Sequence, residues 1–550
     1  MSRSIRAVLA ADPDVGAGNV MTRLVELGEP LDGPGLAFDT DVDGHPAWGV
    51  LTLGELYRTV AARAALLRDS GVRRRDPVAI LVSTSADCLL SFMALTWLGA
   101  IPALINPALP RDVAAEYIRR LRATGLIADA AHRELLDGET LGLERRLGLE
   151  RDLVLEAERM GEGDPDAAPS PYRLHQDDPI AITHSSGTTR MPTAVVHTHG
   201  SLFAGTRLIR LATPRARGTE RVMSALPAPH AAGIASINHV MCNRGELLYL
   251  SRQDDGAAIL DAIERWKPTG IFGFAVTWAE LARFDLTQRA VDSVAMWFNT
   301  GDCAHEPHVR RLVAAGSHEK FTREGIRRVP GSMFIDGLGS TEMGHSAFHI
   351  THRSDTDHYG RCVGRPHVFA EIALIDVETG EEVPPGTVGH FALKAPSVAA
   401  GYWNDSTSWY RTRWNGYYLT GDLLYRDEEG YYYHVDRAVD AVDLGGGDWL
   451  YTAMSEERIL KQCPDVRDCT VLARRDGGER VVTDVLLALH TGADPHADRS
   501  APIRAALGDA AAATLREISV VEDGDLITGP TGKVRKFLMR QRALADSAAG

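Results

Sequence analysis

Apolar and polar positions follow two different periods between residues 52 and 110. Residues 53–72 (LGELYRTVAARAALLRDSGV) have the spacing of an amphipathic helix, whereas residues 77–82 (PVAILV) form a short continuous apolar run. Such a run is typical of a strand that is covered on both faces. A second apolar helix and a second such run (AIPALIN, residues 100–106) follow. Alternation of this kind predicts a mostly parallel α/β sheet.

The strand signal recurs at five later places, which are RVMSALP (221–227), ELLYL (246–250), GIFGFAV (270–276), SVAMWFN (293–299) and SMFIDGLG (332–339). From residue 370 onward, short strands alternate with glycine and proline turns, which predicts a β subdomain. The last segment has helix and strand signals of its own. We therefore expect a large α/β domain with helix-covered sheets and a β subdomain (residues 1–437), followed by a small α+β domain (residues 438–550).

Residues 88–110 carry no charge, but Gly99, Pro102, Asn106 and Pro107 interrupt the run. A membrane span needs about 20 uninterrupted apolar residues. This stretch therefore predicts a buried helix, a turn and a buried strand, with no membrane span. The N-terminal residues turn acidic without a sustained apolar region, so no signal peptide is expected.

Composition narrows the choice of partners. The 550 residues are too many for one compact core. The net charge of −15 argues against broad nucleic-acid binding, which needs a basic surface. The six cysteines contain no C-x-x-C pair, which favours free thiols in a reducing compartment. We expect a cytoplasmic protein.

Five short motifs carry candidate chemistry. The loop HSSGTTR (184–190) is rich in hydroxyl groups that could contact phosphate, although it is not the common G-x-x-x-x-G-K-[ST] loop. DGLGSTEMG (336–344) ends a predicted strand, LTGDL (419–423) precedes VDR (435–437), and PTGK (530–533) lies near the end. Each motif alone also fits a turn, a helix cap or a surface charge. His345, His349 and His352 have helical spacing, but no cysteine or carboxylate completes a metal set.

Taken in order, these motifs resemble those of the adenylate-forming superfamily, which contains acyl-CoA synthetases, adenylation domains of peptide synthetases and luciferases. The resemblance extends from about residue 52 to Arg540. It implies a mobile C-terminal domain and two half-reactions. A carboxylate first attacks Mg·ATP to give an acyl-AMP, and a thiol such as coenzyme A then displaces AMP.

The resemblance also implies a role for individual residues. Thr341 contacts the AMP phosphate, Glu342 holds Mg²⁺, Lys533 bridges acyl and phosphate oxygens, and His230 lies at the mouth of the acyl pocket. Asp422 binds the ribose hydroxyls and Arg437 the ribose or phosphate. The nucleotide set is Ser185, Ser186, Gly187, Thr188, Thr189, Asp302, Asp336, Gly337, Leu338, Gly339, Ser340, Asp422 and Arg437. Gly445 and Gly446 resemble the glycines of the thiol tunnel. The acyl pocket is expected to draw on Gly233, Trp278, Asn299, Gly301 and Met343.

The phosphate loop departs from the family pattern at three positions. Arg190, Thr193 and Ala194 stand where the family has glycine, lysine and glycine. A Cβ in the left-handed region costs roughly 1–2 kcal/mol, and a lost charged contact to phosphate about 1.5–3 kcal/mol. Leu338 replaces the family's adenine-stacking tyrosine, and Val439 stands at the hinge position.

These losses concern the β- and γ-phosphates, which take part only in the first half-reaction. The sequence therefore gives the hypothesis that this chain mainly converts the adenylate of a bulky apolar acid to its CoA thioester, with a separate ligase supplying the adenylate. Three alternatives stay open. They are a complete ATP-dependent acyl-CoA ligase, an enzyme that loads a carrier protein, and a non-catalytic protein that binds adenylates.

Overall fold

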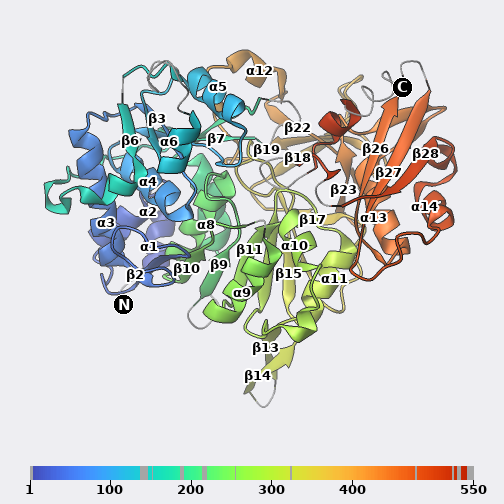
Figure 1. Cartoon of the computed structure of the whole chain (residues 1–550), viewed down its shortest axis with the longest axis horizontal. Coiled ribbons are helices and arrows are strands. Elements are labelled where there is room, and N and C mark those ends of the chain that lie inside the picture. Colours follow the sequence, from blue (N-terminus) through green and yellow to red (C-terminus); the bar gives the residue numbers. More distant parts are fainter. Residues whose placement is uncertain are drawn as a thin grey trace.

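The computed structural model describes residues 4–136, 147–151, 153–185, 191–213, 220–253, 255–322, 325–476, 480–522, 525–528 and 534–541. Figure 1 shows two large sheets with their helices and, at one end, the region that holds the C-terminus. The helices of the larger part are α1 Ile5–Ala11, α2 Val20–Glu26, α3 Leu53–Asp69, α4 Ser85–Trp97, α5 Arg111–Leu121, α6 Ala130–Leu136, α8 Ala231–Met241, α9 Gly256–Trp266, α10 Ala275–Leu281, α11 Glu306–Ala314 and α12 Ser406–Arg411.

The first sheet has seven strands in the order β20-β8-β7-β4-β3-β5-β6. Its strands are β3 Pro77–Leu81, β4 Ile101–Leu104, β5 Gly125–Ala128, β6 Leu153–Glu156, β7 Pro179–His184, β8 Ala194–Thr198 and β20 Gly401–Tyr402. The pairs β3–β4, β3–β5, β4–β7 and β5–β6 are parallel. The continuous apolar runs therefore predicted both the strands and their parallel pairing.

The second sheet has fourteen strands, with the path β18-β19-β22-β23-β17-β16-β15-β12-β11-β9-β10-β1-β2 and with β21 paired to β22. Its strands are β1 Pro34–Phe38, β2 Val50–Thr52, β9 Arg221–Ser224, β10 Glu246–Tyr249, β11 Gly270–Phe274, β12 Met296–Thr300, β15 Met333–Asp336, β16 Phe348–His352, β17 Cys362–Pro366, β18 Glu371–Ile375, β19 Gly389–Lys394, β21 Arg413–Trp414, β22 Tyr417–Arg426 and β23 Tyr432–Arg437. The predicted β subdomain is thus hydrogen-bonded through β17 and β16 to the parallel strands.

Helices α3, α4 and α8 pack in a core that contains side chains of both sheets. Helix α3 begins with a reciprocal cap in which Thr52 Oγ1 accepts from the Glu55 N–H and the Glu55 carboxylate accepts from the Thr52 N–H. Helix α4 is apolar on nearly every side and is almost wholly buried. The main core contains side chains of α3, α4 and α8 together with Ile80 of the first sheet and Phe272 of the second. The uncharged stretch is therefore core, and no helix within the described ranges is long and apolar enough to cross a membrane.

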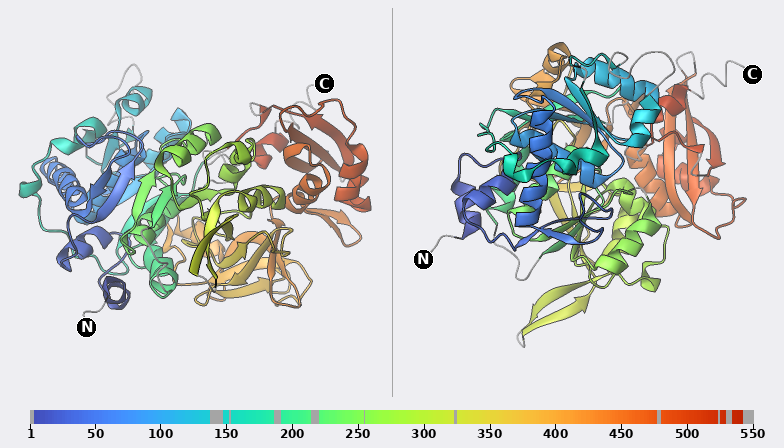
Figure 2. Two further views of the ribbon diagram at one scale, coloured as in Figure 1. Left: turned by 90° about the horizontal axis from the view of Figure 1, so that it is seen from below. Right: turned by 60° about the vertical axis from the view of Figure 1, so that its left-hand side comes forward.

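The C-terminal region has a core of its own, built from residues between Val442 and Ile518. Its elements are β24 Val442–Gly445, β25 Asp448–Leu450, α13 Thr452–Gln462, β26 Val466–Arg475, β27 Val481–Leu489, α14 Ser500–Leu507, α15 Asp509–Ala512 and β28 Leu515–Val520. Figure 2 shows this region beside the end of the larger part. A separate core supports the predicted division after residue 437, which stays a prediction. The remaining sheet is the hairpin of β13 (Ser317–Thr322) and β14 (Gly325–Pro330), which projects from the molecule in Figure 1.

Candidate active site

A cavity of about 820 Å³ lies between the larger part and the C-terminal region. The start of α8, the end of β12, the loop after β15 and the facing strands β22 and β23 contribute to its wall. Residues 534–537 contribute from the C-terminal side. The cavity therefore lies where motif residues of the larger part meet the segment that follows the PTGK motif.

Asp422 and Arg437 lie opposite each other on neighbouring strands β22 and β23. Arg437 Nε is 3.2 Å from Asp422 Oδ1. Burial opposes ionisation of Asp422, but the positive Arg437 and the nearby His434 outweigh it and hold the pKa of Asp422 below its ordinary value. Both predicted residues line the cavity, and the ionised Asp422 carboxylate is suited to accept hydrogen bonds from hydroxyl groups.

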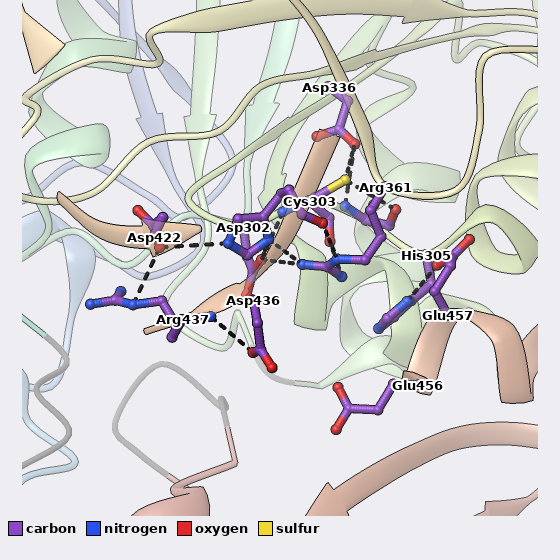
Figure 3. A network of polar contacts seen from close by, with 12 residues as sticks. Asp302, Cys303, His305, Asp336, Arg361, Asp422, Asp436, Arg437, Glu456 and Glu457 are labelled. Atoms are coloured by element: carbon purple, nitrogen blue, oxygen red, sulfur yellow. Dashed lines mark hydrogen bonds and ion pairs between the residues drawn. The ribbon is translucent and has the colours of Figure 1, made fainter. Parts of the chain in front are cut away.

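A buried polar network lies beside this pair (Figure 3). Arg361 Nη2 donates to Asp302 Oδ1 at 3.1 Å and to His434 Nδ1 at 2.6 Å. The backbone amide of Cys303 also donates to Asp302 Oδ1, at 2.8 Å. The sequence motifs predicted Asp302 but not Arg361 or His434. Arg361 lies 73 residues before His434 in the sequence, and no motif links the two.

Thr341 and His230 meet at another part of the cavity wall. His230 precedes α8 and caps it, because its Nδ1 accepts from the Ala232 N–H at 3.1 Å. The proton of the neutral ring is therefore on Nε2, which lies 3.2 Å from Thr341 Oγ1 and donates to it. The structure thus brings together two residues that are 111 positions apart and that the motifs named separately.

Glu342 lies next to Thr341 on the cavity wall, where Tyr402 donates to its Oε1 at 3.3 Å. Burial raises the pKa of Glu342, and a nearby cation would lower it again. Across the residues the structure describes, no group of three His, Cys, Asp or Glu could hold a metal. Glu342 still fits Mg²⁺, because this ion is often bound by one or two carboxylates with phosphate oxygens and water.

The phosphate loop is described only in part. Ser185 lines the cavity, and its backbone N–H donates to the carbonyl of Thr193, which also lines it. Ser186, Gly187, Thr188, Thr189 and Arg190 lie outside the described residues.

The lysine motif is likewise incomplete, because Lys533 lies outside the described residues. Its neighbours Thr528 and Val534 form a β-bridge and border the cavity. The next lysine, Lys536, also borders the cavity and lies 2.7 Å from Glu456 of α13.

Gly445, the last residue of β24, and Gly446, in the turn that follows, are exposed and do not border the cavity. In this arrangement the lysine segment faces the cavity and the glycine turn does not. Val439, at the predicted hinge, is 60 % exposed, and Arg540 contacts its carbonyl and the carboxylate of Asp440.

Several predicted positions lie behind the cavity rather than in its wall. Asp336 is buried, accepts from Asn299 at 2.6 Å, and burial raises its pKa to about 6. Leu338, Gly339, Ser340 and Gly301 line the cavity, whereas Gly337 does not. Gly233, Trp278, Asn299 and Met343 do not border this cavity, and their role in an acyl pocket stays a prediction. Trp278 and Met343 are fully buried, Asn299 accepts the indole N–H of Trp278, and Gly233 packs on the carbonyls of Pro227 and Ala228.

Two histidines form a part of the wall that sequence reasoning missed. His239 of α8 and His345 line the cavity with nearly parallel rings, 5.8 Å apart between centroids. Burial lowers the pKa of both, that of His239 to about 3. The helical interpretation of His345, His349 and His352 is wrong, because His349 and His352 lie on strand β16. A spacing of three or four residues does not by itself separate a helix from a strand and its preceding turn.

Comparison with known proteins agrees with the motifs. The family described as AMP-binding enzyme matches residues 39–403. A 3-aminoavenalumate diazotase of a Streptomyces species is 42 % identical over 569 aligned residues, which cover 99 % of each chain. A feruloyl-CoA synthase of an Amycolatopsis species is 27 % identical and covers 78 % of this chain and 81 % of its own.

Among solved structures, an anthranilate CoA ligase in complex with anthranoyl-AMP has a TM-score of 0.81 at 21 % identity, and the match covers 99 % of this chain and 100 % of that one. At this identity the likeness shows the fold alone, and the fold agrees with the predicted α/β class. The family match covers well over half of the chain, and the motif residues Thr341, Glu342, Asp422 and Arg437 border one cavity. The chain therefore belongs to the AMP-binding enzyme family, within the adenylate-forming superfamily that its motifs predicted.

Proposed function

We propose that this protein is an ATP-dependent diazotase, which joins nitrite to AMP and passes the nitroso group to a primary aromatic amine. The observation that carries the proposal is the 42 % identity to a diazotase over nearly the full length of both chains. The feruloyl-CoA synthase reaches only 27 % and covers less of either chain. We therefore expect an amino-substituted aromatic acid as the substrate.

The chemistry has two steps, which correspond to the two half-reactions of the superfamily. A nitrite oxygen attacks the α-phosphorus of ATP, the bond to the β-phosphate breaks, and pyrophosphate leaves. The amine nitrogen then attacks the nitroso nitrogen, the N–O bond to AMP breaks, and the amine loses a proton. The resulting N-nitroso amine shifts its second proton to oxygen and loses hydroxide, which leaves the diazonium ion. The released proton and hydroxide form water.

The cavity supplies groups for these steps. In the proposal, Asp422 accepts hydrogen bonds from the ribose, and Thr341, oriented by His230, donates to the phosphate. Glu342 is the carboxylate that would hold Mg²⁺, whose charge would neutralise phosphate oxygens. Lys533 keeps its predicted place at the reacting oxygens. The facing lysine segment suits adenylate formation, because residues 534–537 already border the cavity.

This proposal changes the meaning of the altered phosphate loop. A nitroso donor reacts with the amine directly, so no thiol is needed after adenylate formation. In this proposal the enzyme still uses ATP, although its phosphate loop has Arg190, Thr193 and Ala194 in place of the family's residues.

Thioester formation from an acyl adenylate and CoA is the second candidate. It is supported by the glycine turn at residues 445–447 and by the CoA-ligase relative. In that candidate a separate ligase upstream supplies the adenylate.

One experiment separates the candidates. The purified enzyme is given Mg·ATP and ¹⁵N-nitrite with a set of amino-substituted aromatic acids, and the diazonium ion is captured by azo coupling to a naphthol. In parallel it is given a synthetic acyl-AMP with CoA. A ¹⁵N-labelled azo product that requires both ATP and enzyme supports the diazotase. A thioester without any azo product would instead support the second candidate.

A further inference from the structure

Arg361 is a buried arginine with an unusual backbone. Its φ is +65°, in the left-handed region that disfavours residues with a Cβ, and its side chain is only 3 % exposed. Such a conformation persists when the surrounding contacts hold it, and it occurs most often at functional sites. Arg361 also borders the cavity, directly before strand β17.

The contacts of Arg361 converge on His434. The carbonyl of Arg361 accepts from the His434 N–H at 3.0 Å, and Arg361 Nε donates to the carbonyl of His434 at 3.2 Å. Its Nη2 donates to His434 Nδ1 at 2.6 Å and to Asp302 Oδ1 at 3.1 Å. A guanidinium has no acceptor, so His434 Nδ1 must keep its lone pair. The proton of the neutral imidazole is therefore on Nε2.

This Nε2 proton faces Asp422, the carboxylate expected to bind the ribose. His434 Nε2 lies 3.6 Å from Asp422 Oδ1, longer than a hydrogen bond, and Arg437 Nε lies 3.2 Å from the same oxygen. Both positive or donating groups therefore lie on the Oδ1 side of the carboxylate. Within the described part of the chain, Asp422 Oδ2 has no hydrogen bond. It is the oxygen left to accept a hydrogen bond from a ligand hydroxyl.

We propose that Arg361 is a positioning residue for ribose recognition, which fixes the tautomer and orientation of His434 so that Asp422 presents Oδ2 to the hydroxyls of a ribonucleotide. Arg361 acts through His434 and Asp302 and does not itself touch the sugar. The inference rests on the proposed function only in assuming that a nucleoside phosphate enters this cavity. Figure 3 shows Arg361 beside Asp302 and Cys303.

The test is equilibrium binding of Mg·ATP and of 2′,3′-dideoxy-ATP, which lacks both hydroxyls. Wild type is expected to bind ATP more tightly. In Arg361→Gly, which relaxes the backbone but removes the guanidinium, this preference should fall about 10-fold, in line with the loss of one charge-assisted contact. His434→Phe should lower the preference for ATP by a similar factor. The double variant should lose no more of this preference than the more strongly affected single variant, because both residues act on one contact.

Arg244→Gly is the matched control. Arg244 also has a positive φ of 56°, but it contacts the carbonyls of Pro30 and Pro34 and does not border the cavity. Both affinities should stay unchanged in this variant. If circular dichroism shows that Arg361→Gly does not fold, Arg361→Lys is measured instead, and the same ratio of the affinities for ATP and 2′,3′-dideoxy-ATP decides.

Two results would overturn the inference. One is an equal loss of affinity for both nucleotides in the Arg361 variant, which would indicate a structural role only. The other is a wild type that does not distinguish them. Binding needs neither nitrite nor CoA, so failure of the diazotase assay leaves this measurement fully decisive.

Discussion

His305 Nδ1 lies 2.7 Å from Glu457 Oε2, so a buried pair links the start of α11 to α13 of the C-terminal region (Figure 3). Burial works against a charged imidazole, but the Glu457 carboxylate outweighs it and raises the pKa of His305. Burial likewise opposes the ionised Glu457, and His305 outweighs it, so the pKa of Glu457 is lowered. The Glu306 N–H also donates to Glu457, at 3.1 Å. These contacts connect the larger part to helix α13, whose Glu456 in turn pairs with Lys536 beside the cavity.

The first prediction concerns the pH dependence of this pair. A raised folded-state pKa gives stabilisation that is complete below the unfolded pKa of about 6.5 and is lost as pH rises through the folded value. His305→Gln should therefore lower the thermal midpoint most near pH 6 and progressively less in alkaline buffer. Below the ordinary pKa of Glu457 the difference should also shrink, as that carboxylate is protonated. A midpoint difference that does not change between pH 6 and pH 9 would contradict the ion-pair assignment.

The second prediction separates two lysines. Lys536 lies 2.7 Å from Glu456 and donates to Thr452 Oγ1, so Lys536→Met leaves a buried carboxylate without its cation. Breaking a buried pair costs about 3–5 kcal/mol, so chemical denaturation should show a clear loss of stability. Lys533→Met should leave stability nearly unchanged and lower the rate of pyrophosphate release about 100-fold, as expected for loss of a group that stabilises transition-state charge. The reverse pattern would show that Lys536 is the reacting lysine.

The third prediction concerns the histidine wall. A Cβ on Gly205 would lie 1.9 Å from Cδ2 of His345, while the backbone of Gly205 is ordinary right-handed helix. Gly205→Ala should therefore move the imidazole without straining the backbone. We expect the KM for the amine to rise about 10-fold, within the usual cost of overpacking, with the KM for ATP unchanged. In a His345→Ala background the same change should have little further effect, and an additive loss would refute the clash.

The fourth prediction concerns the altered phosphate loop. Arg190→Gly with Thr193→Lys restores the family's glycine and lysine at these positions. Because a charged contact to phosphate contributes about 1.5–3 kcal/mol, the double change should tighten Mg·ATP binding about 10-fold or more. Binding of AMP serves as the control, since it lacks the β- and γ-phosphates and should change little. Equal effects on ATP and AMP would contradict the assignment of this loop to the outer phosphates.

The fold could be predicted from the sequence because its signals are local. Runs such as residues 77–82 and 270–276 are apolar on both faces, and a strand covered on both sides requires that pattern. The cavity residues Thr341, Asp422 and Arg437 were found because short motifs keep their order along the chain.

The remaining site residues depend on contacts that sequence spacing does not show. Trp278 lies on α10 and Asn299 on β12, both near the cavity, but their side chains are hydrogen-bonded to each other in the core. Arg361 reaches His434 across neighbouring strands β17 and β23, and only the paired structure reveals its positive φ. The nucleotide motifs do not distinguish an amine acceptor from a thiol acceptor, because they serve both reactions.

The most direct test of the account is the formation of a diazonium ion from an amino-substituted aromatic acid, ¹⁵N-nitrite and Mg·ATP by the wild-type enzyme. We predict a ¹⁵N-labelled azo-coupling product, formed together with AMP and pyrophosphate in equal amounts, and no dependence on CoA. Its absence across the amine set, alongside efficient conversion of acyl-AMP and CoA to a thioester, would contradict the diazotase proposal.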